Sequence, residues 1–432
     1  MDANTIGTII LIGSFFVLIA LRFPIAFALG VSSVLCCAYI GRPITMVAQN
    51  IVRGINTFSL MAVPFFIIAG EVMGAGGISD RLIKLADACV GWMRGGLAIV
   101  NCLDSTFFGG ISGSSAADTA SLGPIVIPMM TKQGYPLEFA TSITIASSVQ
   151  GILIPPSHNM VIYAMVAGSV SVGALFRAGL VPGVLLGLTL SVDCYVQAVR
   201  HNYPRGSAFS LKKIFIALKE SILSLFTLLI VVFGVTLGIF TATEAAGFAC
   251  IWSIFLAMVV YREVTPKDLW RLLGKSMRTI SMVMILIGTS AAFGWLLGFL
   301  KVPEMVSNLI LGFSTNKVVV ILIINLLLLL FGMLMDMAAI ITITTPILLP
   351  IAMQIGMDPI HYGAMMLLNL GIGLLTPPVG NTLFIGAAIT GMKIEKLAKA
   401  TIPFYIVMGL LLIIIAFCPA VVLTVPRLMG YM

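Results

Sequence analysis

The fold can be predicted starting from one stretch of the sequence, Gly151-Ile-Leu-Ile-Pro155-Pro156. A near copy, Gly373-Leu-Leu-Thr-Pro377-Pro378, stands 222 residues further along the chain. Each copy lies inside an otherwise apolar segment. Proline removes a backbone donor and clashes with the preceding turn, so a Pro-Pro pair must open any helix that contains it. The sequence therefore predicts two interrupted helices at equivalent positions.

A second motif repeats at the same spacing. Pro124-Ile-Val-Ile-Pro128 matches Pro346-Ile-Leu-Leu-Pro350, again 222 residues later. The same offset also pairs Asn159 with Asn381, Gly134 with Gly356, and Ala116-Ala117 with Ala338-Ala339. One offset that serves several motifs indicates an internal duplication.

Composition excludes an ordinary soluble domain. The 432 residues are 60% hydrophobic and only 9% charged, whereas soluble domains carry roughly 25% charged residues. Apolar stretches long enough to cross a bilayer recur along the chain, and in lipid only helices or closed barrels satisfy their own backbone. The long apolar runs predict an all-α polytopic membrane protein.

The net charge of +8 does not indicate nucleic-acid binding, because Lys and Arg fall in short segments between apolar runs. Such segments are typical topology signals. Seven cysteines, mostly inside apolar segments and without a CxxC pair, predict neither disulfides nor a metal site. We also expect no organic cofactor.

Length and apolarity predict about ten full spans. A charged amphipathic segment at 77–92 and a short stretch at 303–313 are expected to lie along the membrane interface. The expected full spans include two that carry the Pro-Pro interruptions, and they cover roughly 5–21, 23–41, 57–73, 137–168, 173–198, 221–240, 242–260, 279–299, 360–391 and 401–424.

Two further apolar segments, 95–131 and 317–352, are expected to be re-entrant hairpins. The first is interrupted halfway by the small-residue cluster Gly109-Gly110-Ile111-Ser112-Gly113-Ser114-Ser115. Clustered glycines and serines break helical packing and favour a tight return of the chain. Each copy of the duplication therefore contains one hairpin and one broken helix.

Basic residues set the expected orientation. The segments 200–219 and 262–278 each hold five Lys or Arg residues, which places both in the cytoplasm. Counting crossings from there puts both termini in the periplasm and makes the two copies cross in opposite senses. Inverted repeats with discontinuous helices mark transporter binding sites near the bilayer midplane. Opened helices offer carbonyls to a cation, and half-helix starts offer N–H groups to an anion.

Three stretches together resemble the large (M, or DctM-like) membrane subunit of tripartite ATP-independent periplasmic (TRAP) transporters. They are FFGGISGSSAADTASLGPIVIP at 107–128, GILIPPSHNMVIY at 151–163 and GLLTPPVGNTLF at 373–384. The resemblance implies a bacterial inner-membrane importer, driven by sodium, that moves small organic anions such as carboxylates by an elevator mechanism. It also implies a small four-helix membrane subunit, here a separate chain, and a periplasmic solute-binding protein as partners.

The resemblance also implies the binding residues. The first sodium site would use Gly109, Ser112, Gly151, Ile154 and Pro155, mostly through carbonyls. The second would use Gly332, Met335, Gly373, Thr376, Pro377 and Val379, with Thr376 adding a hydroxyl. The substrate would lie between the hairpin tips, near Ser114, Ser115, Ser157, Asn159 and Asn381. Sodium is the only metal expected, and the residues do not reveal which carboxylate is carried.

The chain divides accordingly into scaffold and transport parts. Expected parts are 1–94, scaffold helices and an interfacial arm; 95–198, the first hairpin, broken helix and following span; 199–316, cytoplasmic loops, scaffold helices and a second arm; 317–392, the second hairpin and broken helix; and 393–432, the C-terminal span. The hairpins and broken helices would form the moving transport domain.

Two other functions match parts of the sequence. A stand-alone divalent-anion sodium symporter would share this architecture and would need no binding protein. The motif Gly110-Ile111-Ser112-Gly113 also matches the GxSG nucleophile of intramembrane proteases, which requires a histidine to activate the serine. A protease explains neither the duplication nor the second Pro-Pro break, so no enzyme activity is expected.

Several isolated polar residues in apolar segments have open roles. Asp118 and Asp336 stand beside the hairpin tips and either support an ion site or cap a half-helix. Asp104 lacks a polar counterpart in the second copy, which favours a structural role. Arg177 could meet an anion, although such an arginine more often reaches the lipid headgroups, which is the role expected here. His158 either binds substrate or caps the opened helix.

Overall fold

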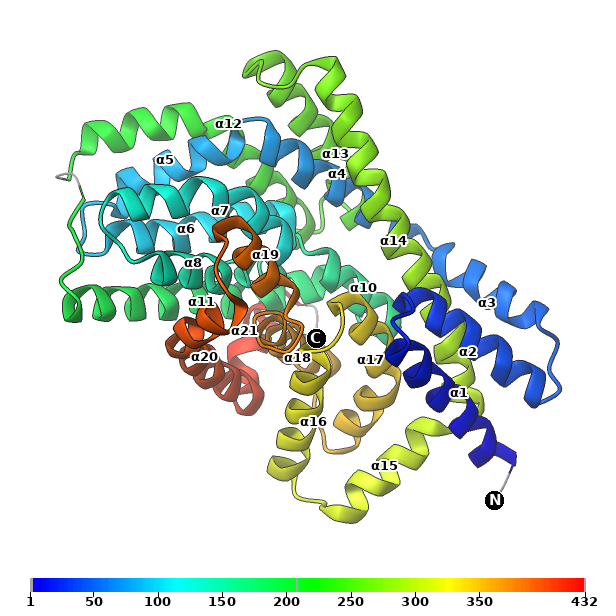
Figure 1. Ribbon diagram of the computed structural model, residues 1–432. Coiled ribbons are helices and arrows are strands. Elements are labelled where there is room, and N and C mark those ends of the chain that lie inside the picture. Colours follow the sequence, from blue (N-terminus) through cyan, green and yellow to red (C-terminus); the bar gives the residue numbers. More distant parts are fainter. Residues whose placement is uncertain (1–2, 207–208, 431–432) are drawn as a thin grey trace.

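The computed structural model of the protein describes residues 3–206 and 209–430. Within those ranges all regular secondary structure is helical and no strand forms (Figure 1). Seven of the described helices are long and apolar enough to cross a membrane, or eight when one bent pair is counted as a span. The all-α class predicted from the sequence is confirmed, while the expected ten crossings stay a prediction, because α1 and α2 fall below that length.

Five α-helices form the N-terminal part of the chain, and the first three lie together at one edge of the molecule (Figure 1). They are α1 (Ala3–Ala20), α2 (Ile25–Tyr39), α3 (Thr45–Ile55), α4 (Ala62–Ala75), which follows a 3-10 turn, and α5 (Ile78–Val90). We did not predict α3, because an eleven-residue amphipathic helix is too short and polar to stand out as a span. Its apolar face packs on α14, so tertiary contact stabilises it.

The first copy of the duplication begins with a hairpin of two helices. The hairpin consists of α6 (Gly96–Ser112) and α7 (Ser115–Lys132). It is followed by α8 (Leu137–Ser147), α9 (Gln150–Leu153), α10 (His158–Ala167) and α11 (Val172–Arg200). The chain bends by 46° between α8–α9 and α10, at the break that contains Pro155 and Pro156. The interruption predicted from the Pro-Pro pair is therefore confirmed.

The middle of the chain contains α12 (Leu211–Thr236), α13 (Ala242–Phe255) with a terminal π turn, α14 (Pro266–Phe299) and α15 (Val302–Phe313). We expected 262–278 to be a loop, and this was wrong. Thr265 and Asp268 form a capping box that starts α14 at Pro266, and proline at the first helical position is favourable. The basic residues of that segment therefore extend from a helix.

The second copy and the C-terminus complete the fold. They comprise α16 (Lys317–Gly332), α17 (Met337–Gln354), α18 (Pro359–Gly373), α19 (Asn381–Thr390), α20 (Ile394–Phe417) and α21 (Pro419–Leu428). The single final span expected over 401–424 was wrong. Helix α20 ends at Phe417, and Pro419 cannot continue the hydrogen-bond ladder, so a separate short helix follows.

The two copies present the same elements in the same order. The hairpin α6–α7 is followed by α8–α9, a break and α10, and the hairpin α16–α17 is followed by α18, a break and α19. Gly134 and Gly356, paired by the offset, both adopt positive φ after the hairpin, at 96° and 75°. This order of elements is consistent with the duplication, which stays a prediction from the sequence.

Helix α14 contacts both the N-terminal helices and the second hairpin. It crosses the view of Figure 1 diagonally and packs against α2, α3 and α4 as well as the hairpin helix α17. A single large apolar core runs through both copies. Helix α14 thus packs against the second hairpin, while α4 packs against α6, α7 and α10 of the first copy.

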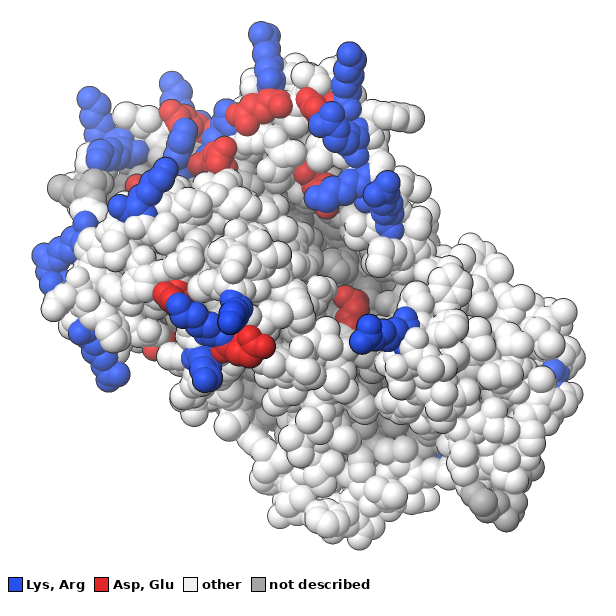
Figure 2. Space-filling model, viewed as in Figure 1, with Lys and Arg blue, Asp and Glu red and all other residues white. Residues whose placement is uncertain are grey.

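The surface matches a membrane environment. In Figure 2 charged side chains gather over the region of α5, α12 and the α13–α14 turn, and a large part of the visible surface carries almost none. Large apolar side chains such as Ile251 (74%) and Met282 (72%) are exposed. Apolar surface on this scale is unfavourable in water and favourable against lipid.

Candidate functional site

The tip of the first hairpin touches the first helix break through glycines. An alanine at Gly109 would place its Cβ 2.6 Å from the Cα of Gly151, closer than real Cβ contacts allow. Only two glycines permit this approach of α6 to α9. At Gly110 a Cβ would lie 3.1 Å from Ile154 Cγ2 and 3.2 Å from the Pro155 carbonyl oxygen.

The residues expected at the first sodium site are thereby brought together. Gly109 lies against Gly151, and Gly110 lies against Ile154 and Pro155. Ser112 ends α6 at the same tip, where its hydroxyl lies 3.4 Å from the Ser114 nitrogen. The hairpin tip and the opened backbone of the break thus form one neighbourhood, in which a cation could meet several carbonyls.

The second copy repeats this contact. A Cβ at Gly373 would lie 2.6 Å from the Cα of Gly332. The break is also bonded to the hairpin, because the Val379 nitrogen donates to the Met333 carbonyl at 3.0 Å. Of the residues expected at the second sodium site, Gly332, Gly373 and Val379 therefore meet.

The other three expected residues of the second site are nearby in the chain. Met335 is buried in the turn between α16 and α17, and Pro377 lies in the break. The Thr376 hydroxyl donates to the Ile372 carbonyl at 2.8 Å. A hydroxyl that donates in this way keeps its oxygen lone pairs for a cation.

A central cavity of about 220 Å³ lies between the two copies and the scaffold helices α4 and α14. Its wall includes residues from the starts of four helices, namely α7, α10, α17 and α19. A helix start presents unpaired N–H groups and the positive end of the helix dipole. Four such starts around one cavity favour an anion there.

The four helix starts differ in how they are capped. The Ser114 hydroxyl accepts from the Ala117 nitrogen at 3.4 Å in α7, and Asp336 Oδ1 accepts from the Ala338 nitrogen at 3.0 Å in α17. No side-chain cap is formed at α10 or α19. In α19 the Thr382 and Leu383 nitrogens instead donate to the Leu374 carbonyl, at 3.1 and 3.4 Å.

Most residues expected to bind the substrate line this cavity. Ser114, Ser115, Asn159 and Asn381 are on its wall, whereas Ser157 is buried and is not among the lining residues. The Ser115 hydroxyl lies 2.7 Å from the Ser148 hydroxyl and 3.1 Å from that of Thr382 in α19. The second of these bonds connects the first hairpin to the second broken helix, whereas Ser148 belongs to the first broken helix.

Several lining residues come from the scaffold and were not predicted. Gly70 and Glu71 of α4 and Thr279 and Val283 of α14 complete the wall. Glu71 forms an ion pair with Lys275 at 2.8 Å. An acid in an apolar segment was the only sequence signal, because nothing in the sequence specifies that α4 and α14 face the hairpin tips.

The isolated polar residues take different places. His158 lines the cavity, and its Nδ1 has no hydrogen-bond partner among the described residues. Asp104 and Asp118 are buried within the first hairpin, away from the cavity wall. Arg177 is only 2% exposed and does not line the cavity, so the expectation that it reaches the headgroups was wrong. Packing of α11 inside the bundle buries it.

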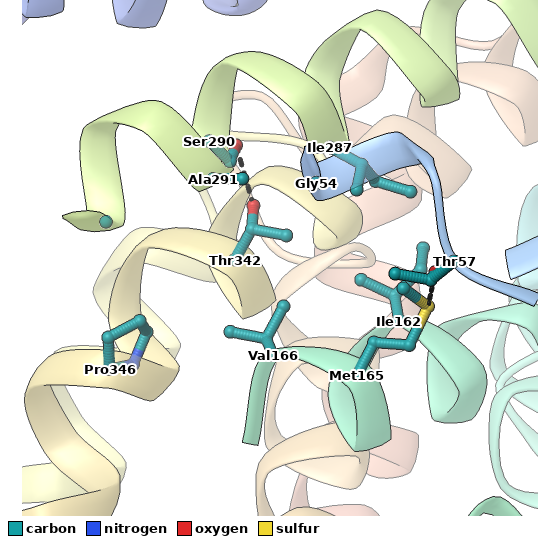
Figure 3. Close-up of a pocket in the computed structure, with 11 residues that line it drawn as sticks. Gly54, Thr57, Ile162, Met165, Val166, Ile287, Ser290, Ala291, Thr342 and Pro346 are labelled. Atoms are coloured by element: carbon teal, nitrogen blue, oxygen red, sulfur yellow. Dashed lines mark hydrogen bonds between the residues drawn. The ribbon is translucent and has the colours of Figure 1, made fainter. Parts of the chain in front are cut away.

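A second cavity, of about 270 Å³, lies between α3 and α14 on one side and α10 and α17 on the other (Figure 3). It is lined by residues of α3, α10, α14 and α17, several of them small, including Gly54 and Ala291. Across it the Thr342 hydroxyl donates to the Ser290 hydroxyl at 2.9 Å. The boundary between these helices therefore contains unfilled space, and its larger lining side chains are Ile162, Met165, Val166, Ile287 and Pro346.

Comparison with known proteins agrees with this architecture. The family model described as "Tripartite ATP-independent periplasmic transporter, DctM component" matches residues 12–421. The C4-dicarboxylate TRAP transporter large permease protein DctM of Pseudomonas aeruginosa is 39% identical, over 86% of this chain and 87% of that protein. The isethionate TRAP transporter permease protein DctMQ of Oleidesulfovibrio alaskensis is 37% identical, over 95% of this chain and 65% of that protein.

The fold has also been seen in a solved structure. The Alcanivorax borkumensis YdaH transporter superposes with a TM-score of 0.62, covering 90% of this chain and 88% of that one, at 14% identity. Identity at this level shows the fold alone. The family match and the relatives carry the assignment: the chain belongs to the DctM family, the large permease component of tripartite ATP-independent periplasmic transporters, and is a multi-pass transport protein, not an enzyme.

Proposed function

We propose that this chain is the transport subunit of a sodium-coupled importer of small organic anions. The observation that carries the proposal is the central cavity, on which four helix starts converge beside two opened helices. Helix starts favour an anion, and opened backbone carbonyls favour a cation, so both partners of a symport reaction have suitable groups close together.

The two glycine contacts support the sodium part of the proposal. Gly109 against Gly151 and Gly332 against Gly373 bring each hairpin tip next to a break. Sodium would replace its water shell there with backbone oxygens, and Thr376 would add a hydroxyl in the second copy. The coupling ion would thus be held by the same tips that enclose the anion.

The arrangement of the elements supports an elevator movement. The two copies are joined by the Ser115–Thr382 bond and by the Tyr163 hydroxyl, which donates to the Pro359 carbonyl. These bonds make one body of the hairpins and broken helices. The boundary of Figure 3, which contains unfilled space, separates that body from α3 and α14. We infer that the body slides along this boundary.

The partners follow from the family. A small four-helix membrane subunit and a periplasmic solute-binding protein would complete the transporter in the bacterial inner membrane. The small subunit would be a separate chain. The exposed apolar surface would meet that subunit and membrane lipid.

Reconstitution tests the proposal. Both membrane subunits are placed in proteoliposomes, and uptake of the radiolabelled ligand that copurifies with the cognate binding protein is measured under an inward sodium gradient. Uptake that requires both sodium and the binding protein is expected. Unchanged uptake in potassium or choline would refute sodium coupling. Robust sodium-driven uptake by this chain alone would instead identify a stand-alone divalent-anion symporter.

A further inference from the structure

The charges on the wall of the central cavity are unexpected for an anion site. Among the described residues that line it there is no Lys or Arg, and there are two acids, Glu71 and Asp336. Glu71 is neutralised by its ion pair with Lys275. Asp336 forms no ion pair with any described residue. The cavity therefore has one carboxylate without a cationic partner.

Asp336 is the counterpart of a neutral residue in the first copy. The 222-residue offset pairs it with Ser114, and both residues cap the second helix of their hairpin. The cap needs only an acceptor oxygen, which serine supplies equally well. The negative charge at 336 is therefore not required for capping.

The first copy presents the neutral, donor-rich side of the cavity. Asn159 is 5% exposed and lines the cavity. It stands in the first turn of α10, where no side chain caps the helix. Its side-chain amide can donate to a ligand bound in the cavity. The Asn159 amide and the α10 start thus form the part of the wall that suits an anionic group.

The second copy presents the acidic side. Asp336 and Asn381 line both the central cavity and an adjoining apolar cavity of about 550 Å³. A second carboxylate of a bound ligand would meet Asp336 with no described Lys or Arg on the wall to offset the repulsion. A hydroxyl group there would instead donate to the Asp336 carboxylate, a favourable charge-assisted hydrogen bond.

We infer that the central cavity selects monoanionic hydroxy acids over dicarboxylates, with the acid group at the start of α10 and the hydroxyl groups toward Asp336. This inference rests on the proposed function and narrows it to a substrate class. The two relatives described above are named for a dicarboxylate and for a hydroxylated monoanion, so similarity alone does not choose between the classes. The Asp336 carboxylate is the feature of this chain that favours monoanionic hydroxy acids over dicarboxylates.

Four-carbon probes isolate the effect of charge. L-Threonate has one carboxylate and three hydroxyls, L-tartrate has two carboxylates and two hydroxyls, and butyrate has one carboxylate alone. Binding is measured by thermal stabilisation of the purified complex of both membrane subunits in sodium, without the binding protein, so that only the membrane site selects. Threonate should bind at least about tenfold more tightly than tartrate or butyrate.

Two substitutions make the test specific. Asp336→Asn keeps a capping oxygen and removes the charge, so the preference for threonate over tartrate should fall to within about threefold. Asp358→Asn is the matched control, because Asp358 caps α18 through the Ile360 nitrogen at 2.7 Å and does not line the cavity. It should leave the ratio unchanged.

The outcomes separate this inference from the proposed function. Tartrate binding as tight as threonate binding, no threonate binding at millimolar concentration, or an unchanged ratio in Asp336→Asn would overturn the selection. Failure of the proposed function would appear elsewhere, as the absence of sodium-driven uptake by the whole transporter with its binding protein. Sodium-driven uptake together with tight tartrate binding would leave the function intact and reject the substrate class.

Discussion

Ser290 of α14 and Thr342 of α17 share a hydrogen bond of 2.9 Å across the boundary between the scaffold and the second hairpin (Figure 3). Both side chains are buried, at 2% and 3% exposure. The bond crosses the boundary along which we propose that the transport elements slide. The Thr342 hydroxyl also lies 2.8 Å from the Ala338 carbonyl oxygen of its own helix, so its single hydrogen can turn to that carbonyl when the crossing bond breaks.

The first prediction is that joining these two residues stops transport. Ser290→Cys with Thr342→Cys should form a disulfide under a mild oxidant, because hydroxyls 2.9 Å apart place their Cβ atoms near disulfide range. Uptake should fall to background and recover on reduction. The exposed Cys418 is first replaced by serine, and each single cysteine variant is the control. Full uptake by the cross-linked protein would show that this boundary does not move.

The second prediction concerns the glycine contacts. Gly109→Ala and Gly373→Ala should each reduce sodium-dependent uptake at least about tenfold, and Gly151→Leu should abolish it, because a Cβ at these positions meets backbone atoms. Gly409→Ala is the control, since nothing lies within 4 Å of a Cβ there. Uptake is compared at matched expression. Wild-type activity in all three variants would mean that the breaks are only kinks.

The third prediction separates backbone from hydroxyl at the first hairpin tip. Ser112→Ala should retain most uptake, because the Ser112 hydroxyl only contacts the Ser114 backbone, at 3.4 Å to its nitrogen. Ser112→Pro should abolish uptake, because proline removes a backbone donor in the last turn of α6. Sodium dependence of uptake is measured for both. An inactive Ser112→Ala that folds normally would assign a ligand role to the hydroxyl.

The fourth prediction is topological. Cysteines introduced at Lys212 and Lys275 should be labelled only from the cytoplasm, because basic residues concentrate in those segments. Cysteines beside either terminus should be labelled from the periplasm. Labelling uses a membrane-impermeant maleimide on intact cells, with permeabilised cells as the reference. Periplasmic labelling at Lys212 would contradict both this topology and the proposed inversion of the repeats.

The membrane class, the duplication and the two helix breaks could all be predicted from the sequence pattern. These features depend on local chemistry: a Pro-Pro pair opens a helix wherever it stands, and apolar length requires lipid. The hairpin tips could be located for the same reason, because clustered glycines interrupt a helix. One offset was enough to relate Asn159 to Asn381 and Ser114 to Asp336.

Which scaffold side chains line the central cavity depends on tertiary packing and could not be predicted from the sequence. Glu71 and Lys275 are 204 residues apart, yet they pair beside the cavity because α4 packs against α14. Helix α3 and the charged start of α14 form in segments that lack a spanning signal, since packing and capping stabilise them. Burial of Arg177 follows from the neighbours of α11. Local propensity acts over a few residues, whereas these contacts depend on how distant helices pack, so the sequence pattern could not show them.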